Sequence, residues 1–184
     1  PEPLENTGTG TNYGLELTVQ HNFDKSFYVM LTGAIFNSTY KGSDGITRNT
    51  DFNGNYGTSL LAGKEFKVGK RGTILIGTNI TWAGGRRHGY VDTVASAAAR
   101  EVIYLDEGYN ELQFKDYFRA DLKINYKLNT KKLTHEFGLD LVNVLGIENL
   151  LAITYTPPTT ENPSGIVISP QLGFLPIFYY RIDF

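Results

Sequence analysis

The sequence predicts an all-β, antiparallel chain whose strands cross a membrane as part of a β-barrel, and three observations predict this fold class. Apolar and polar residues alternate over stretches of about twelve residues, well beyond the length of an ordinary strand. The connections between these stretches alternate between short turns and long loops. Tyr, Phe and Gly are abundant, at 12, 11 and 20 of 184 residues. Because only every second residue of a barrel strand meets lipid, a mean hydropathy of −0.24 is compatible with such a barrel.

Composition excludes several other classes of protein. Lys and Arg total 17 against 19 Asp and Glu, and no face collects a basic run, which argues against nucleic acid as a partner. The absence of Cys excludes disulfides and thiolate metal sites. No apolar run reaches the roughly 18 residues of a transmembrane helix. The first residues, PEPLEN, carry no targeting signal, so we expect a removed signal or a longer parent chain.

Seven strands are predicted in order after an N-terminal loop, 1–11, that is rich in Pro, Gly and Thr. Their ranges are 13–20, 27–40, 55–67, 74–82, 118–128, 133–145 and 174–184. In the second strand the row that alternates with Phe27, Val29, Leu31 and Ile35 contains both apolar and polar residues, so the sequence does not decide which face of this strand is the outer one. The apolar rows are Tyr13, Leu15, Leu17 and Val19; Phe27, Val29, Leu31 and Ile35; Tyr56, Leu60, Ala62 and Phe66; Ile74, Ile76, Ile80 and Trp82; Phe118, Ala120, Leu122, Ile124, Tyr126 and Leu128; Leu133, Phe137, Leu139 and Leu141; and Phe174, Phe178, Tyr180, Ile182 and Phe184.

The connections predict which end of each strand faces which side of the membrane. Turns are expected near 23–26, 68–72 and 129–132, and loops near 41–53, 84–116 and 146–170, with an extended portion near 150–155. Outer-membrane barrels have short periplasmic turns and long extracellular loops. Twelve residues span about 40 Å, and a tilt near 45° reduces this to about 28 Å, the thickness of a bilayer core.

The strand count predicts that the sheet continues beyond this chain. The first and seventh strands run in the same direction, so closing about seven strands into a barrel would require a parallel pair. Bacterial single-chain barrels have even strand numbers and antiparallel pairs, so we expect residues 1–184 to be the C-terminal part of a larger barrel. The alternative is a soluble β-sandwich or barrel with its apolar rows inward. Aromatic residues near the ends of the apolar rows favour the membrane, as at Tyr13, Trp82 and Tyr126.

Six segments carry a resemblance to a known family: NYGLEL at 12–17, FNGNYGTSLLAGKEFKVGK at 52–70, TWAGGRRH at 81–88, DYFRADLKINYK at 116–127, THEFGLDLVNV at 134–144 and GFLPIFYYRIDF at 173–184. They resemble the C-terminal third of TonB-dependent outer-membrane receptors of the Bacteroidota type. The resemblance implies a barrel of about 22 strands with a plugged lumen. It also implies active uptake of a scarce ligand, energised by an inner-membrane TonB complex through an N-terminal part that these residues lack.

The resemblance also implies a location and partners. The chain would lie in the bacterial outer membrane, with its C-terminus periplasmic and its long loops extracellular. Partners would be outer-membrane lipid and lipopolysaccharide, the barrel-assembly machinery and a surface lipoprotein that lids the barrel. The ending resembles the C-terminal assembly signal of outer-membrane barrels, which closes an alternating aromatic strand on a terminal Phe. Its residues here are Phe174, Phe178, Tyr180, Ile182 and Phe184.

Catalytic and metal-binding motifs are not found, so we expect a protein that is not an enzyme and holds no cofactor. His21, His88 and His135 lie far apart and none is part of an H-E-x-x-H motif. The stretch from Asp51 begins like a calcium loop, but Tyr56 stands at the required glycine position and excludes an EF-hand; an irregular calcium site there stays open.

The longest loop supplies the candidate ligand contacts. Arg86 and Arg87 stand at its start and Tyr109 lies within it, and guanidinium groups bind anionic ligands or lipopolysaccharide phosphate. The alternative is that the arginines lie at a solvated loop base or pair with neighbouring strands. The resemblance favours a transport receptor, and the alternatives are an outer-membrane barrel that acts as an adhesin or enzyme through its loops and a soluble β-domain that binds a partner.

Overall fold

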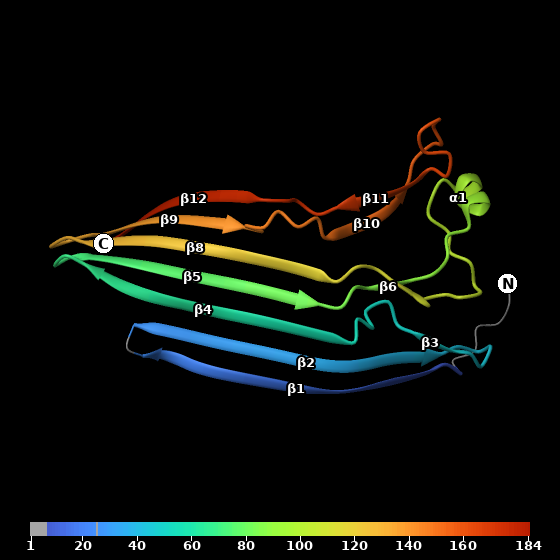
Figure 1. Cartoon of the computed structure of the whole chain (residues 1–184), viewed down its shortest axis with the longest axis horizontal. Coiled ribbons are helices and arrows are strands. Elements are labelled where there is room, and N and C mark those ends of the chain that lie inside the picture. The colour runs from blue at the N-terminus through green and yellow to red at the C-terminus, as the bar shows by residue number, and fades with distance from the viewer. Residues whose placement is uncertain (1–6, 25) are drawn as a thin grey trace.

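The computed structural model describes residues 7–24 and 26–184 as one long antiparallel sheet with accessory elements at one end (Figure 1). This confirms the predicted all-β, antiparallel class. The accessory elements are the helix α1 (Thr93–Ala99) and the pairs β6 (Arg87–His88) with β7 (Leu112–Gln113) and β10 (Leu150–Tyr155) with β11 (Ile166–Pro170). In the sheet, neighbours run in the order β1 (Thr9–Asp24), β2 (Phe27–Lys41), β4 (Tyr56–Val68), β5 (Gly72–Ala83), β8 (Tyr117–Asn129), β9 (Thr134–Val142) and β12 (Leu175–Asp183), with β3 (Thr47–Asn49) added beside β2.

The outermost strands, β1 and β12, each pair with one neighbour and not with each other. Both therefore present a free row of backbone groups, which is a site for pairing with further strands. Among the described residues no helix is both long and apolar enough to span a membrane.

Several strand bounds differ from the predicted ones because pairing decides where a strand ends. β1 begins at Thr9, four residues before the predicted start at 13, since Thr9 pairs with Lys41 at the end of β2. β9 ends at Val142 rather than 145, because Asn143 takes a φ of 51° and begins a turn closed by its carbonyl and the amide of Gly146, 2.8 Å apart. The predicted loop 41–53 contains β3, and the extended portion expected at 150–155 is β10.

The members of all seven predicted apolar rows that lie within strands fall on one face of the sheet, and Leu133, Phe174 and Phe184 lie just outside the strands. Side chains of directly opposed residues in an antiparallel pair point to the same side. This register also answers the question left open for the second strand, whose row on this face begins at Phe27. One row across the sheet joins Phe66, Ile74, Tyr126, Phe137 and Tyr180, and a second joins Val19, Leu31, Leu60, Ile80 and Ala120.

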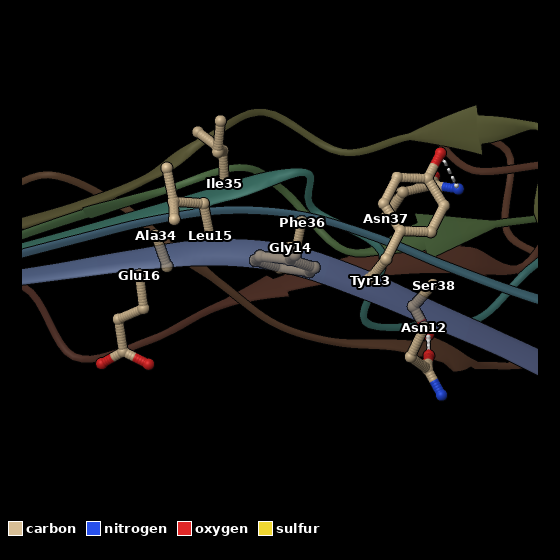
Figure 2. A pocket seen from close by; sticks show the side chains of 10 residues that line it. All are labelled: Asn12, Tyr13, Gly14, Leu15, Glu16, Ala34, Ile35, Phe36, Asn37 and Ser38. Atoms are coloured by element: carbon tan, nitrogen blue, oxygen red, sulfur yellow. Dashed lines mark hydrogen bonds between the residues drawn. The ribbon is translucent and has the colours of Figure 1, made fainter.

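Figure 2 shows the alternation on the edge pair β1 and β2, where Leu15 and Ile35 point to one side and Glu16 to the other. The same view shows Tyr13 beside Asn37, whose amide nitrogen donates to the tyrosine hydroxyl at 3.4 Å. These residues line a shallow, open depression of about 440 Å³ along the edge of the sheet. Its walls come from two adjacent strands only, so it is a feature of the uncovered edge.

On the opposite, polar face, large rings lie flat over glycines of the neighbouring strand. Tyr28 is directly opposite Gly63, and Tyr179 is directly opposite Gly138. A Cβ added to Gly138 would meet ring atoms of Tyr179 at 2.1–2.2 Å, and one added to Gly63 would meet the Tyr28 ring at 2.6 Å. Glycine is required at these positions because the ring occupies the space of a side chain.

The distribution of burial is the reverse of that in a water-soluble domain. Within the described residues no hydrophobic side chain is buried, while the apolar face exposes residues such as Leu15 (70%) and Phe178 (76%). The buried side chains are polar: Asn53, Ser96, Asn110, Asn125, Glu136, Asn143 and Asn149. A soluble domain is held together by apolar burial, so this sheet requires an apolar environment on its apolar face.

The two ends of the sheet differ as the sequence predicted. The end with the C-terminus, here called the turn end, carries the short connections 69–71 and 130–133 and the connection between Asp24 and Phe27 (Figure 1). The other end, here called the loop end, carries the connections 42–55, 84–116 and 143–174, with β3, β6, β7, β10, β11 and α1.

Candidate functional site

At the loop end, the connections 42–55 and 84–116 are joined by side-chain amides. Asn53 is fully buried, and its Nδ2 donates to Oδ1 of Asn37 at 2.9 Å and to Oδ1 of Asn49 at 2.8 Å. Asn110 is 2% exposed, and its Nδ2 donates to the backbone oxygen of Asn49 at 2.9 Å and to Oδ1 of Asp51 at 2.7 Å. We call these residues the asparagine network. Because every bond lies within the protein, the network holds the two connections in one arrangement.

Arg87 belongs to this network. Its Nε donates to the carbonyl of Asn53 at 3.0 Å and its terminal nitrogen to Oδ1 of Asn55 at 2.7 Å. Its backbone nitrogen also donates to the carbonyl of Asp51 at 2.8 Å. The side chain predicted as a ligand contact therefore also ties the start of the longest loop to the connection 42–55.

A pocket of about 130 Å³ opens beside the network. It receives side chains from the connections 42–55 and 84–116 and from β10. Aromatic rings dominate its wall: Tyr104 meets Tyr109 edge-on, with centroids 6.2 Å apart, and His88 stacks on Phe114 at 4.0 Å. The lining residues are Asp51, Arg86, Arg87, His88, Tyr104, Tyr109, Asn110, Phe114 and Ile153. We call this the rim pocket.

The rim pocket contains the charged side chains of Asp51, Arg86 and Arg87, and Arg86 is the arginine that the asparagine network does not use. Its guanidinium makes no hydrogen bond or ion pair with the described part of the chain, and its backbone carbonyl accepts from Phe114. Burial raises the pKa of the Tyr104 hydroxyl, and neighbouring Tyr109 raises it further, whereas Arg86 opposes this shift. Tyr104 therefore stays protonated at neutral pH and can donate a hydrogen bond.

The size and chemistry of the rim pocket define what it can hold. Small-molecule sites usually have about 300–1,000 Å³, so this pocket has room for one ring or one acidic group of a larger molecule. Tyrosine and histidine rings can stack on a planar or sugar face, while an unpaired guanidinium binds a carboxylate or phosphate. No Ser or Cys nucleophile lines it.

The structure brings the predicted contact Tyr109 together with the other two, the adjacent residues Arg86 and Arg87, although it is distant from them in sequence. Sequence reasoning missed Tyr104 and Ile153. Tyr104 follows a stretch that looks helical, and Ile153 comes from β10, so only the folded arrangement places them here.

The residues of the predicted assembly signal take different positions. Phe178, Tyr180 and Ile182 lie on β12 and point to the apolar face, opposite residues of β9. Phe174 lies just before β12 and Phe184 just after it, and Phe184 is fully exposed.

Within the described residues, no group of three or more His, Cys, Asp or Glu side chains is placed to hold a metal ion. The calcium-like stretch is used otherwise, since Asn53 and Asn55 are engaged in the asparagine network. His135 and Glu136 point to opposite faces of β9.

Comparison of the chain with protein-family models, with curated proteins and with solved structures finds no match.

Proposed function

We propose that this chain is the C-terminal part of the barrel of an outer-membrane TonB-dependent receptor that takes up a scarce ligand. The long connections face the cell exterior and the C-terminus faces the periplasm. The remaining strands of a barrel of about 22 strands pair with β1 and β12, and a plug domain fills the lumen. The partners are outer-membrane lipid and lipopolysaccharide, the barrel-assembly machinery, the TonB complex and a surface lipoprotein lid.

One observation carries the proposal: the apolar face is exposed and the buried side chains are polar. A single sheet of this kind has no hydrophobic core in water, but in a barrel wall its apolar rows contact lipid. Strands of 12–16 residues in β1, β2, β4, β5 and β8 match the height of a tilted transmembrane strand. The free edges of β1 and β12 support continuation of the sheet.

The rim pocket supports a receptor over an adhesin, because it is a concave site at the loop end with an available cation. It recognises one acidic or planar group of the ligand. The asparagine network holds this site in place on the strand ends below it.

The test is a comparison of culture media after growth of three strains: wild type, a strain lacking the full-length gene and a strain lacking the inner-membrane TonB complex. Mass spectrometry would measure which solutes remain. We expect the same class of solutes to accumulate in both mutant cultures and to be consumed by wild type.

A matched pair of variants connects uptake with the rim pocket. Arg86→Gln removes the unpaired cation, and uptake of the identified solute should fall about tenfold or more, the loss expected for one charged hydrogen bond. Arg100→Gln removes a loop arginine outside the rim pocket and should leave uptake unchanged. Indistinguishable media from wild type and the gene-deletion strain would refute transport by this protein.

A further inference from the structure

Charge is distributed unequally between the two ends of the sheet. Exposed basic residues gather at the turn end, whereas the loop end is rich in carboxylates. The carboxylates in the longest loop alone are those of Asp92, Glu101, Asp106, Glu107, Glu111 and Asp116. At the turn end the basic residues are Lys64, Lys67, Lys70, Arg71, Lys131 and Lys132.

The basic residues of the turn end lie on adjacent turns and strands. The turn 69–71 is hydrogen-bonded to the end of β8, where the amide of Asn129 donates to the carbonyl of Arg71 at 2.9 Å, and the turn 130–133 follows directly from Asn129. This contact places Lys70 and Arg71 on one turn beside Lys131 and Lys132 on the next. All four side chains are exposed.

These cations have no carboxylate partners within the described part of the chain. The ion pairs at this end use Arg181, which binds Glu136 at 2.7 Å and Asp183 at 3.3 Å, and Lys127, which lies 3.9 Å from Glu136. The carboxylates of Glu136 and Asp183 are therefore engaged, and the turn cations keep their full field toward solvent or a ligand.

One basic side chain near the turn end, Lys64, lies on the apolar face of the sheet and indicates that a ligand of these cations would lie on that side. It lies on the apolar face, directly opposite Phe27 on one side and Ile76 on the other. Its Nζ is 5.4 Å from the centroid of the Phe66 ring. Lys64 lies four residues before the end of β4 at Val68, and a lysine among apolar residues in this part of a strand extends its ammonium group toward the headgroup region.

We infer that the turn end binds the phosphate headgroups of anionic phospholipids in the membrane leaflet that surrounds it. This inference rests on the proposed membrane insertion. The complementarity is local: the hydrocarbon chains contact the apolar face, while Lys64 and the basic turns contact the phosphate. The carboxylate-rich loop end repels the same headgroups, so the preference belongs to one leaflet.

The experiment uses the full-length protein in phosphatidylcholine vesicles that contain spin-labelled lipid. Electron paramagnetic resonance measures the fraction of labelled lipid that the protein immobilises. Phosphatidylglycerol should associate about fivefold more strongly than phosphatidylcholine, as expected for roughly one basic group per headgroup, and the preference should fall toward one in 1 M salt.

Two matched pairs of variants locate the lipid. The combined variant K70Q/R71Q/K131Q/K132Q should lose most of the preference, and Lys41→Gln with Lys115→Gln, at the loop end, should retain it. Lys64→Gln should weaken it, whereas Lys67→Gln, on the polar face of the same strand, should not. Equal effects of Lys64→Gln and Lys67→Gln would overturn the assignment to the lipid-facing side.

The salt series on the unaltered protein tests the inference without any substitution. If the preference for phosphatidylglycerol is absent, or is unchanged by salt, the inference of headgroup binding is wrong. The proposal that the protein inserts into the membrane would not be affected by that result. If no lipid of either kind is immobilised, the protein is not in the bilayer and the proposed function itself fails.

Discussion

Replacing Leu122 by arginine tests whether the apolar face contacts lipid. Leu122 lies near the middle of the 13-residue β8, on the apolar face, opposite Thr78 and Leu141. In a barrel wall this position is close to the bilayer midplane, where an arginine costs about 2–4 kcal/mol. In water the same substitution on an open face would change stability by about 0.5 kcal/mol or less.

The neighbouring residue provides the control. Lys123 points to the polar face, where its Nζ lies 3.4 Å from Oδ1 of Asp140. Both side chains are partly exposed, at 44% and 32%, so Lys123→Ala should cost about 1 kcal/mol or less.

The assay is reversible unfolding of the full-length protein in liposomes over a urea series, followed by tryptophan fluorescence. The reasoning requires a clear difference between the two variants. Comparable losses for Leu122→Arg and Lys123→Ala, or a loss near zero for Leu122→Arg, would refute the assignment of faces.

Three further predictions concern packing, assembly and recognition. Gly138→Ala should destabilise the folded barrel by about 1–3 kcal/mol, because a tyrosine ring fills the space of the new methyl group, while Gly57→Ala, with open space around it, should be close to neutral in the same urea series. Deleting Phe184 should lower the amount of full-length protein in the outer membrane more than Asp183→Asn does, and equal surface abundance by protease accessibility would contradict the role of the terminal residue. Excising residues 90–112 should leave the barrel assembled but weaken uptake. Unchanged uptake at normal protein levels would show that the loop takes no part in ligand recognition.

The sheet could be predicted from the sequence because its signal is local. A strand shows neighbours to opposite faces, so a row such as Phe118 to Leu128 is visible without knowing its partners. Consecutive strands joined by short turns then pair as hairpins, and the apolar rows fix the register. The bounds were less accurate, because the start of β1 at Thr9 depends on how far β2 extends to meet it.

The arrangement of the loop end could not be predicted in the same way. β3, β6 and β7 have only two or three residues, and they form because β3 pairs with β2 while β6 and β7 pair with each other within one connection. The role of Asn53 depends on Asn37 and Asn49, which the fold brings together and no spacing indicates. On the polar face, the need for Gly63 becomes evident only when the register places Tyr28 over it.

The asparagine network has a consequence for how the protein responds to its surroundings. The network is built mainly from amide groups, which do not titrate in the range that cells encounter, together with the guanidinium of Arg87 and the carboxylate of Asp51. Hydrogen bonds between buried amides are also little screened by ions. The hydrogen bonds among these amides should therefore hold in fresh or saline surroundings, whereas a site held by ion pairs between exposed side chains would loosen as the salt concentration rises.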